Sequence, residues 1–322
     1  MSDTNPMFFS FVIPLYNKAE YVSKTLSSVL AQTYPHFEVI VVNDGSTDNS
    51  LDVARTFTDD RIKIITQSNK GASAARNMGI NAAKYELIAL LDADDWLDKS
   101  FLEEMLVLIK EYPDVSLYTS QFGDIRNHKI LPRKKIFKNN FKNTGCFNLF
   151  QMALELKIPS TYCIGVVIRK SILQKSGFFD EQITHGEDTD FFIRIGMYSK
   201  VAYIEKGPLA FYNHDVDVKK RASGNVPPIK KHLFNYFGKY TAYYKEYPRL
   251  EAFINKYILD GLYVYNHLEN YSEIKKLMLK NISIKQYSFK HLLKYYIPTA
   301  VLDYIVTVYR KIKGIHLNRL YS

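Results

Sequence analysis

The chain has 322 residues, of which 47% are apolar, and it is long enough for one large domain or two smaller ones. Two cysteines are too few for a disulfide framework, and the first residues lack the apolar run of a signal peptide, so we expect a cytoplasmic protein. The formal net charge of +10 favours an anionic partner, which is a nucleic acid, a membrane surface or a phosphorylated ligand.

Short β-branched runs alternate with helical patterns in the first third of the chain. This alternation is typical of a parallel sheet covered by helices. The first helix is expected to begin near Asn17, which forms a capping-box pattern with Glu20. Further helices are expected from about Asp48 and through Arg76. Strands are expected at 9–13, 37–42, 62–65 and 87–91.

The rest of the chain has a mixed pattern. A helix is expected around 101–110, a strand near 115–120 and an irregular basic loop over 126–142. Helix and strand signals resume at 147–156 and 164–168. From about residue 230 the chain is rich in Tyr, Phe, Leu, Ile and Lys, which favours a helical C-terminal region.

Polar residues follow the predicted strands at the edge where ligands bind in open α/β sheets. Tyr16, Asp44 and Asp92 all stand at the carboxyl ends of these strands. After Asp92, the segment Ala93-Asp94-Asp95 adds two more carboxylates. Burying such acids is costly unless a cation neutralises them, and their hard oxygen atoms suit Mg²⁺ or Mn²⁺. A solvated turn that caps the next helix is the alternative.

Two further residues have both a functional and a structural interpretation. Asp44 has the chemistry to accept hydrogen bonds from a nucleotide base, with Gly45 allowing close backbone approach, or else it starts a turn. Arg76 is suited to a phosphate or a ribose, or else it is a surface charge with a packed stem.

Taken together, four segments resemble glycosyltransferase family 2 in their order and spacing. These segments are Phe11 to Asn17, Val41 to Asp48, Gly71 to Asn77 and Leu91 to Asp95, and the resemblance extends over roughly residues 8 to 215. The resemblance implies a GT-A fold, in which a Rossmann-like mixed α/β sheet is flanked by helices. It also implies an inverting mechanism and a divalent metal, Mg²⁺ or Mn²⁺.

The resemblance also assigns roles to single residues of the first half. By it, Asp44 reads the base, and Asp92 and Asp94 form the acid pair that binds the ribose and the metal-bridged diphosphate. Asp94 is thus the expected metal ligand. The remaining expected contacts with the nucleotide-sugar donor are Pro14, Tyr16, Glu20, Arg76 and Ala93.

The second half supplies the expected catalytic base. The segments Gly177 to Glu181 and Gly186-Glu187-Asp188 resemble the acceptor side of the family, in which the Asp of the Glu-Asp pair deprotonates the acceptor hydroxyl. Glu187 and Asp190 are the alternatives, and acids at a helix start are the structural interpretation of all three. His214 is a second expected metal ligand by resemblance, although Asn213 stands where the family often has a basic residue.

These inferences predict a catalytic domain over 1–225, with a donor half at about 8–120 and an acceptor half at 121–225, and a helical region over 226–322. The basic, amphipathic tail after about residue 285 either lies on the inner surface of the membrane or packs on the catalytic domain.

The predicted function is transfer of a sugar from a nucleotide-diphosphate donor, a UDP-sugar by preference, to a hydroxyl of a glycan or lipid-linked acceptor. A nucleic-acid-binding protein is disfavoured because no matching motif is present and acidic loops repel phosphates. An inactive member of the family is the other alternative. A dinucleotide oxidoreductase is excluded because the first turn lacks Gly-x-Gly-x-x-Gly.

Overall fold

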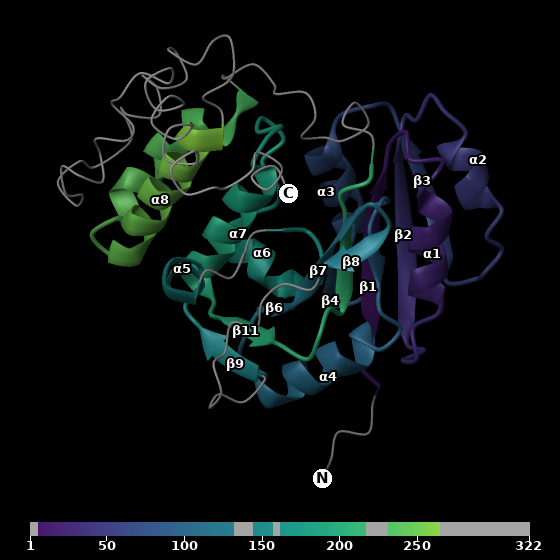
Figure 1. The fold of residues 1–322 in the computed structure, drawn as a ribbon, viewed down its shortest axis with the longest axis horizontal. Helices are drawn as coiled ribbons and strands as arrows, with labels where there is room; N and C mark the ends of the chain where they lie inside the picture. Colours follow the sequence, from purple (N-terminus) through teal and green to yellow (C-terminus); the bar gives the residue numbers. More distant parts are fainter. Residues whose placement is uncertain (1–5, 132–143, 157–161, 217–230, 265–322) are drawn as a thin grey trace, which may run out of the picture. The chain divides into compact units, whose positions relative to one another are not determined.

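The computed structural model describes residues 6–131, 144–156, 162–216 and 231–264. The chain divides into two compact units, Met1–Leu233 and Phe234–Ser322. The first unit holds a mixed β-sheet flanked by helices, so the predicted fold class is confirmed (Figure 1).

Within the described residues, the main sheet has eight strands. In spatial order they are β3 (Ile62–Gln67), β2 (Phe37–Asp44), β1 (Phe9–Leu15), β4 (Leu87–Leu90), β10 (Val166–Arg169), β6 (Leu117–Ser120), β11 (Val201–Ile204) and β9 (Thr144–Phe147). Strands β3, β2, β1 and β4 are parallel, whereas β10 runs antiparallel to both β4 and β6. The four parallel strands therefore end at one edge of the sheet.

A second, smaller sheet lies in the same unit. Its strands in order are β5 (Trp96–Leu97), β12 (Ala210–Asn213), β7 (Phe122–Arg126) and β8 (Lys129–Leu131). Strands β7 and β8 form a hairpin at the start of the stretch predicted to be an irregular loop, so that prediction was wrong for 126–131. The remainder of that predicted loop up to residue 142 lies outside the described residues.

Helices and single helical turns connect these strands. The α-helices are α1 (Val22–Leu30), α2 (Ser50–Arg55), α3 (Ala72–Ala82), α4 (Phe101–Glu111), α5 (Leu149–Gln151), α6 (Leu173–Ser176) and α7 (Glu187–Tyr198). A π-helical turn, η1 (Met152–Leu156), follows α5, and a 3₁₀ turn, η2 (Lys170–Ile172), precedes α6.

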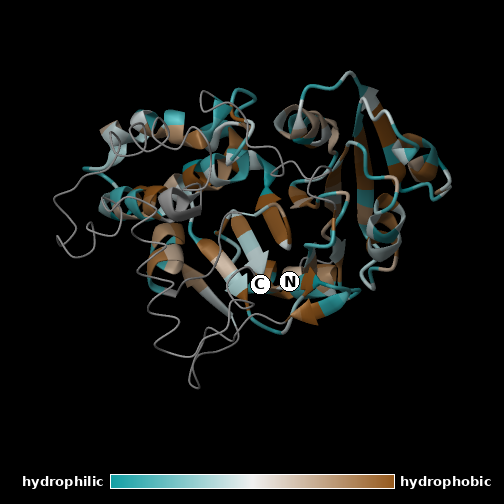
Figure 2. Cartoon of the chain, turned by 45° about the horizontal axis from the view of Figure 1, so that its top comes forward, coloured by the Kyte–Doolittle hydropathy of each residue, from teal (hydrophilic) through white to brown (hydrophobic). Residues whose placement is uncertain are grey.

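The core of the first unit lies on both faces of the parallel strands. One face of β1, with Phe9, Phe11 and Ile13, packs in the same buried cluster as residues of α1 and α4. All eight residues of β2 are buried, as expected for a parallel strand covered on both faces. The apolar character of these strands is visible as brown ribbon in Figure 2.

The described part of the second unit is helical. It contains the 3₁₀ turns η5 (Leu233–Asn235), which starts at the end of the first unit, and η6 (Phe237–Tyr243), followed by helix α8 (Pro248–Val264). The rings of Phe234 and Phe237 lie 5.9 Å and 5.7 Å from that of Tyr257. No helix in the described ranges is both long and apolar enough to cross a membrane. The predicted amphipathic tail after residue 285 lies outside those ranges.

Helix α3 covers the face of β1 and β2 opposite to α1, and Gly79 sets how closely it approaches. A Cβ atom at Gly79 would lie 2.4 Å from Val12 Cγ1 and 3.3 Å from Val42 Cγ2. Both contacts are with short branched side chains of the buried strands, which have little room to move. Because α3 also carries Arg76, this packing helps to position that side chain.

We predict that Gly79→Ala lowers the free energy of unfolding by about 1–3 kcal/mol, because the added methyl group overpacks the interface between α3 and the sheet. Urea denaturation followed by circular dichroism measures the change. Asn81→Ala, at an exposed position of the same helix, is the matched control and should change stability by less than about 0.5 kcal/mol. Equal stability of the Gly79→Ala variant and the wild type would contradict this packing.

Candidate active site

Loops from the ends of the parallel strands meet at one edge of the main sheet. The loop after β1 contacts the loop after β2 through several hydrogen bonds. The amide of Thr47 donates to Asn17 Oδ1 over 2.8 Å, and the amide of Lys18 donates to Ser50 Oγ over 2.6 Å. Asn17 has φ of 51°, a left-handed conformation that Asn tolerates better than most residues.

These contacts correct the predicted start of the first helix. Helix α1 begins at Val22, and Asn17 bonds to the neighbouring loop instead of capping its own helix. Of the residues predicted to contact the nucleotide-sugar donor, Pro14 lies in β1, and Tyr16 is 41% exposed just after it. Glu20 is exposed and lines a pocket described below.

Asp44, at the end of β2, is buried and fully engaged by its own chain. Its Oδ1 accepts hydrogen bonds from Gln67 Nε2 at 2.7 Å and from the Lys70 amide at 2.8 Å. Its Oδ2 accepts one from the Gly71 amide at 2.8 Å. The carboxylate therefore shapes the loop that enters α3. Its predicted role in reading a nucleotide base stays a prediction.

The acidic cluster Asp92-Ala93-Asp94-Asp95 follows β4, and each of its carboxylates has a different partner. Asp92 Oδ1 lies 2.8 Å from Arg76 Nη2, and Asp94 Oδ2 lies 2.5 Å from Lys18 Nζ. Asp95 Oδ1 accepts a hydrogen bond from the amide of Asn213, at the end of β12. The alternative of a solvated turn therefore fails, because the three carboxylates face other segments of the protein.

Asp95 is a structural member of this cluster. It is 2% exposed, and its Oδ1 joins the acidic loop to the second sheet. Burial, together with the charges of Asp94 and Asp92, raises the pKa of Asp95 well above its ordinary value. Its Oδ2 is buried without a hydrogen-bond partner among the described groups. A neutral carboxyl group or a nearby cation satisfies these conditions.

The cluster is chemically suited to a divalent cation. Burial and the charge of Asp92 raise the pKa of Asp94, while the ammonium of Lys18 lowers it. No group of three or more His, Cys, Asp or Glu side chains in the described part of the chain forms a complete metal site. The carboxylates of Asp92 and Asp94 have the chemistry that suits an ion such as Mg²⁺, which commonly uses one or two carboxylates and completes its shell with phosphates and water.

Arg76 joins this cluster to the second half of the unit. Its side chain is almost fully buried, and its Nη1 lies 3.0 Å from Glu187 Oε1 while Nη2 binds Asp92. Burial acts to lower the pKa of Arg76, but the interactions with Asp92, Cys163 and Glu187 outweigh it and raise the pKa well above its ordinary value. The surface-charge alternative for Arg76 is therefore wrong.

Asp188 lies beside this network in the first turn of α7. The helix starts after Gly186, whose φ of 81° lies in the left-handed region that favours glycine. Burial and the neighbouring charge of Glu187 raise the pKa of Asp188 to about 7, against an opposing effect of Arg76. Its rival Asp190 is fully buried and forms an ion pair with Arg194 over 2.9 Å, which favours a structural role.

Residues 231–233 hold the loop that leads into α7, a feature the sequence analysis missed. The amide of Thr184 donates to the carbonyl of Lys231, and the amide of Leu233 donates to the carbonyl of His185. The rings of His185 and His232 lie 4.5 Å apart. Burial and the adjacent His185 lower the pKa of His232 to about 3, and burial also lowers the pKa of the half-buried His185. In sequence these are two distant histidines without a recognisable spacing.

His214 has a partner other than the acidic cluster. Its Nε2 lies 2.8 Å from Asp124 Oδ1 on β7. Asp215 accepts hydrogen bonds from the amides of Asn127 and His128, both at 2.7 Å, and these two residues form the left-handed turn of the β7–β8 hairpin. The segment after β12 therefore holds this hairpin, and the metal-ligand role of His214 stays a prediction.

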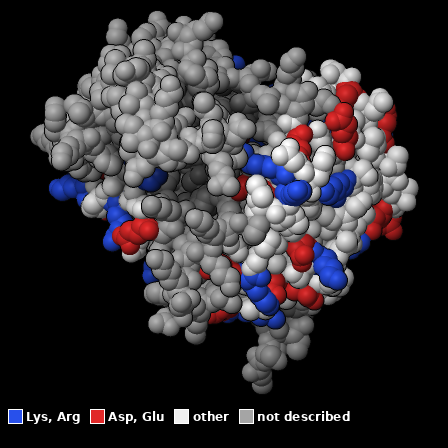
Figure 3. Space-filling model, in the orientation of Figure 1, with Lys and Arg blue, Asp and Glu red and all other residues white. Residues whose placement is uncertain are grey.

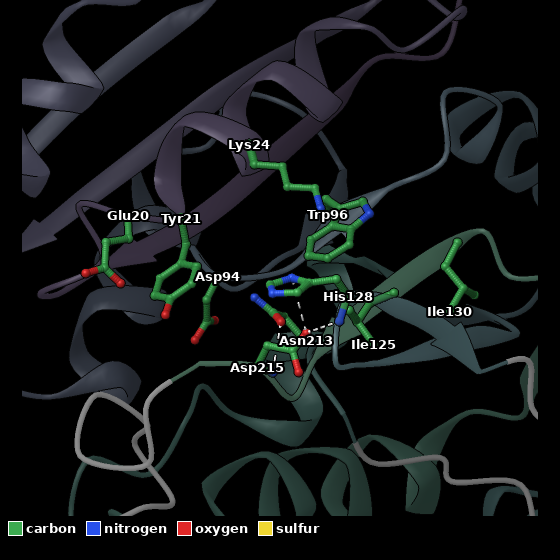
Figure 4. Close-up of a pocket in the computed structure, with 10 residues that line it drawn as sticks. All are labelled: Glu20, Tyr21, Lys24, Asp94, Trp96, Ile125, His128, Ile130, Asn213 and Asp215. Atoms are coloured by element: carbon green, nitrogen blue, oxygen red, sulfur yellow. Dashed lines mark hydrogen bonds and ion pairs between the residues drawn. The ribbon is translucent and has the colours of Figure 1, made fainter.

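A pocket of about 430 Å³ opens beside Asp94 (Figure 4). Asp94 and Tyr21 lie on one side of it, and Lys24 reaches over the ring of Trp96, with Nζ 3.0 Å from the ring centroid. The β7–β8 hairpin forms the opposite wall. The residues that line the pocket are Glu20, Tyr21, Lys24, Asp94, Trp96, Ile125, His128, Ile130, Asn213 and Asp215.

Charged side chains of both signs are interspersed on the described surface seen in Figure 3. Proteins that bind nucleic-acid backbones usually gather Lys and Arg in one stripe or patch. The described residues on this face show a mixture of both signs.

The two cysteines of the sequence, Cys146 and Cys163, are free thiols, and burial raises the pKa of both.

Comparison with solved structures identifies the fold. S. aureus TarS residues 1–349 in complex with UDP-GlcNAc matches with a TM-score of 0.61 and 18% identity, over 90% of this chain and 76% of that one. A second structure of S. aureus TarS matches with a TM-score of 0.66 and 17% identity, over 87% of this chain and 50% of the other. At this identity the likeness concerns the fold, which is GT-A.

Curated relatives are similar over shorter regions. Glycosyltransferase GlyA of Streptococcus pneumoniae serotype 4 is 35% identical over 147 residues, which are 41% of this chain and 21% of GlyA. Glycosyltransferase GlyG of the same strain is 40% identical over 105 residues, 32% of this chain and 35% of GlyG. The matched regions thus span about a third or less of these relatives. Residues 10–177, more than half of the chain, match the model of Glycosyl transferase family 2, and the chain belongs to that family.

Proposed function

We propose that the protein is an inverting glycosyltransferase that moves a sugar from a UDP-linked donor to a hydroxyl group of a glycan or lipid-linked acceptor. Membership of the family and the UDP-GlcNAc bound by the TarS structure support this donor class. The observation that carries the proposal is the contact of one guanidinium group, that of Arg76, with both Asp92 and Glu187. This contact supports a single site, because it joins the predicted donor-side acid Asp92 to Glu187, the neighbour of the predicted base Asp188.

On the donor side, the proposal assigns the diphosphate to the Asp92–Asp94 loop. Divalent cations there, Mg²⁺ or Mn²⁺, would be held by Asp92 and Asp94 and would neutralise charge on the departing nucleotide diphosphate. Tyr16 is exposed just after β1, and Glu20 lines the pocket beside Asp94. A bound donor would need room near Asp94, and the adjacent pocket provides polar and aromatic walls.

On the acceptor side, the proposal assigns the general base to Asp188. A base operates best when its pKa is near the working pH, and that of Asp188 is raised to about 7. Its carboxylate would take the proton of the attacking hydroxyl as the new bond to the sugar forms. Attack opposite to the leaving nucleotide inverts the configuration, which requires base and leaving group on opposite sides of the sugar.

The acceptor and the membrane are part of the same proposal. A growing surface glycan on a lipid carrier would bring the reaction to the inner surface of the membrane. The sequence features that favour this location lie after residue 285, outside the described residues.

A panel of nucleotide sugars tests the proposal. With Mn²⁺ or Mg²⁺ present, we expect at least one UDP-sugar to raise the melting temperature and to be slowly hydrolysed to UDP. GDP- and CDP-sugars serve as matched donor controls, and EDTA should remove the effect of the active donor. If no donor changed the melting temperature or was hydrolysed, with or without metal, the assignment as a nucleotide-sugar transferase would be contradicted.

We predict that Asp188→Asn lowers transfer at least about a hundredfold while UDP binding stays within threefold of the wild type. In the wild type, kcat/KM should fall about tenfold per pH unit below about 7 and level off above it, because only the ionised carboxylate accepts the proton. Initial rates between pH 5 and 9, together with calorimetric titration of UDP, measure both effects.

The Asn variant should keep its fold. The raised pKa means that ionising Asp188 in the folded chain costs free energy as the pH rises from the ordinary carboxyl range to about 7. A neutral amide avoids that cost, so stability at pH 8 should be equal or higher. Turnover of Asp188→Asn at the wild-type rate would show that Asp188 is not the base. Glu187→Gln tests in the same way whether Glu187 is the base.

Arg76 contributes to both halves of the proposed site. Removing its charge leaves Asp92 and Glu187 without their shared cation in a largely buried position. We predict that Arg76→Met lowers the free energy of unfolding by about 3 kcal/mol, as expected when one partner of a buried ion pair is lost. Urea denaturation measures the loss.

Arg55→Met is the control for Arg76→Met, because the side chain of Arg55 is 63% exposed and its pair with Asp52 is loose at 3.8 Å. Its effect should stay below about 1 kcal/mol. The Arg76 variant should also move the midpoint of the pH profile above 7, since Arg76 lowers the pKa of Asp188. Stability equal to that of the Arg55 variant would show that the ion pairs contribute little.

A further inference from the structure

Lys18 places an ammonium group on the acid that is predicted to bind the metal. Its Nζ lies 2.5 Å from Asp94 Oδ2, and the two side chains are only 12% and 17% exposed. This ion pair is therefore inside the site. Surface lysines form such contacts only transiently, because water and salt compete with them.

The backbone around Lys18 is fixed in a way that directs its side chain towards Asp94. Its amide donates to Ser50 Oγ, and its carbonyl accepts hydrogen bonds from the amides of Tyr21 and Val22. The preceding Asn17 is held in its left-handed conformation by its contacts with Thr47. Hydrogen bonds of its amide and its carbonyl thus fix the backbone position of Lys18.

The two cations of the site differ in their freedom to move. Arg76 is nearly fully buried and binds two carboxylates in fixed, planar geometry. Lys18 carries a compact charge on a flexible stem of four carbons. An ammonium group and a divalent ion compete for the same carboxylate, because both need its negative charge. If one cation leaves the acidic loop when a ligand binds, Lys18 is the one able to do so.

We propose that Lys18 occupies Asp94 in the free protein and gives way to the divalent metal when the nucleotide diphosphate binds, so that metal binds weakly without nucleotide and tightly with it. This inference rests on the proposed function. It makes Lys18 a positioning residue that links metal binding to nucleotide binding, because the lysine neutralises Asp94 until the diphosphate arrives. Once Lys18 has left Asp94, its ammonium group stays near the negative charge of the diphosphate.

Titration of the 322-residue chain with Mn²⁺, with free Mn²⁺ followed by electron paramagnetic resonance, tests the proposal. In the absence of nucleotide, Lys18→Met should bind Mn²⁺ at least about tenfold more tightly than the wild type. Lys18→Arg keeps the charge and should bind as weakly as the wild type. Lys63→Met removes one exposed charge from the edge strand β3 and should leave Mn²⁺ affinity within twofold. Addition of UDP should raise Mn²⁺ affinity of the wild type at least tenfold, and that of Lys18→Met by much less.

The outcomes separate this inference from the proposed function. Equal Mn²⁺ affinities of wild type and Lys18→Met, or no measurable binding by either, would overturn the role of Lys18 even if UDP binds. Failure of the wild type to bind UDP with any metal would overturn the proposed function, while the comparison without nucleotide still decides the competition at Asp94. Lys18→Gln replaces Lys18→Met if the latter does not fold, and the thermal melting curve of each variant establishes this.

Discussion

The site depends on the burial of one positive charge between two negative ones. Arg76 is nearly inaccessible to water, and a lone guanidinium in that position would carry a large desolvation cost. Asp92 from the loop after β4 and Glu187 from the start of α7 offset that cost. The charges therefore stabilise one another only if α3, the acidic loop and α7 come together. Asp188 follows Glu187 directly, so the same packing of α3, the acidic loop and α7 brings the proposed base close to the acidic loop.

Charge also divides the acids of the motif into different roles. Asp92 and Asp94 each face a basic side chain, whereas Asp95 accepts a hydrogen bond from the second sheet. A run of similar residues in sequence thus includes a structural acid, Asp95, next to two acids of the proposed site. The raised pKa of Asp95 agrees with this division, because a neutral carboxyl group can stay buried beside two negative neighbours.

Local patterns predicted the parallel half of the fold and the strand ends that carry the acids, because continuous apolar strands such as β2 have a clear periodicity. Contacts between distant segments were beyond such patterns. Asn17 matched a capping box, yet its side chain bonds across 30 positions to Thr47. The pair of Lys18 with Asp94 joins residues 76 positions apart. The β7–β8 hairpin was missed because its Asn127–His128 turn depends on the carboxylate of Asp215, far away in sequence.

The short bridge between His185 and His232 has a consequence for where the first unit ends. The chain between residues 184 and 186 is held by residues 231–233, and that support comes from the last residues of the first unit. A protein shortened to end before Lys231 would keep every acid of the proposed site and still lose two backbone hydrogen bonds beneath the start of α7. The first unit thus includes the residues that brace the loop before α7 as well as the acids of the proposed site.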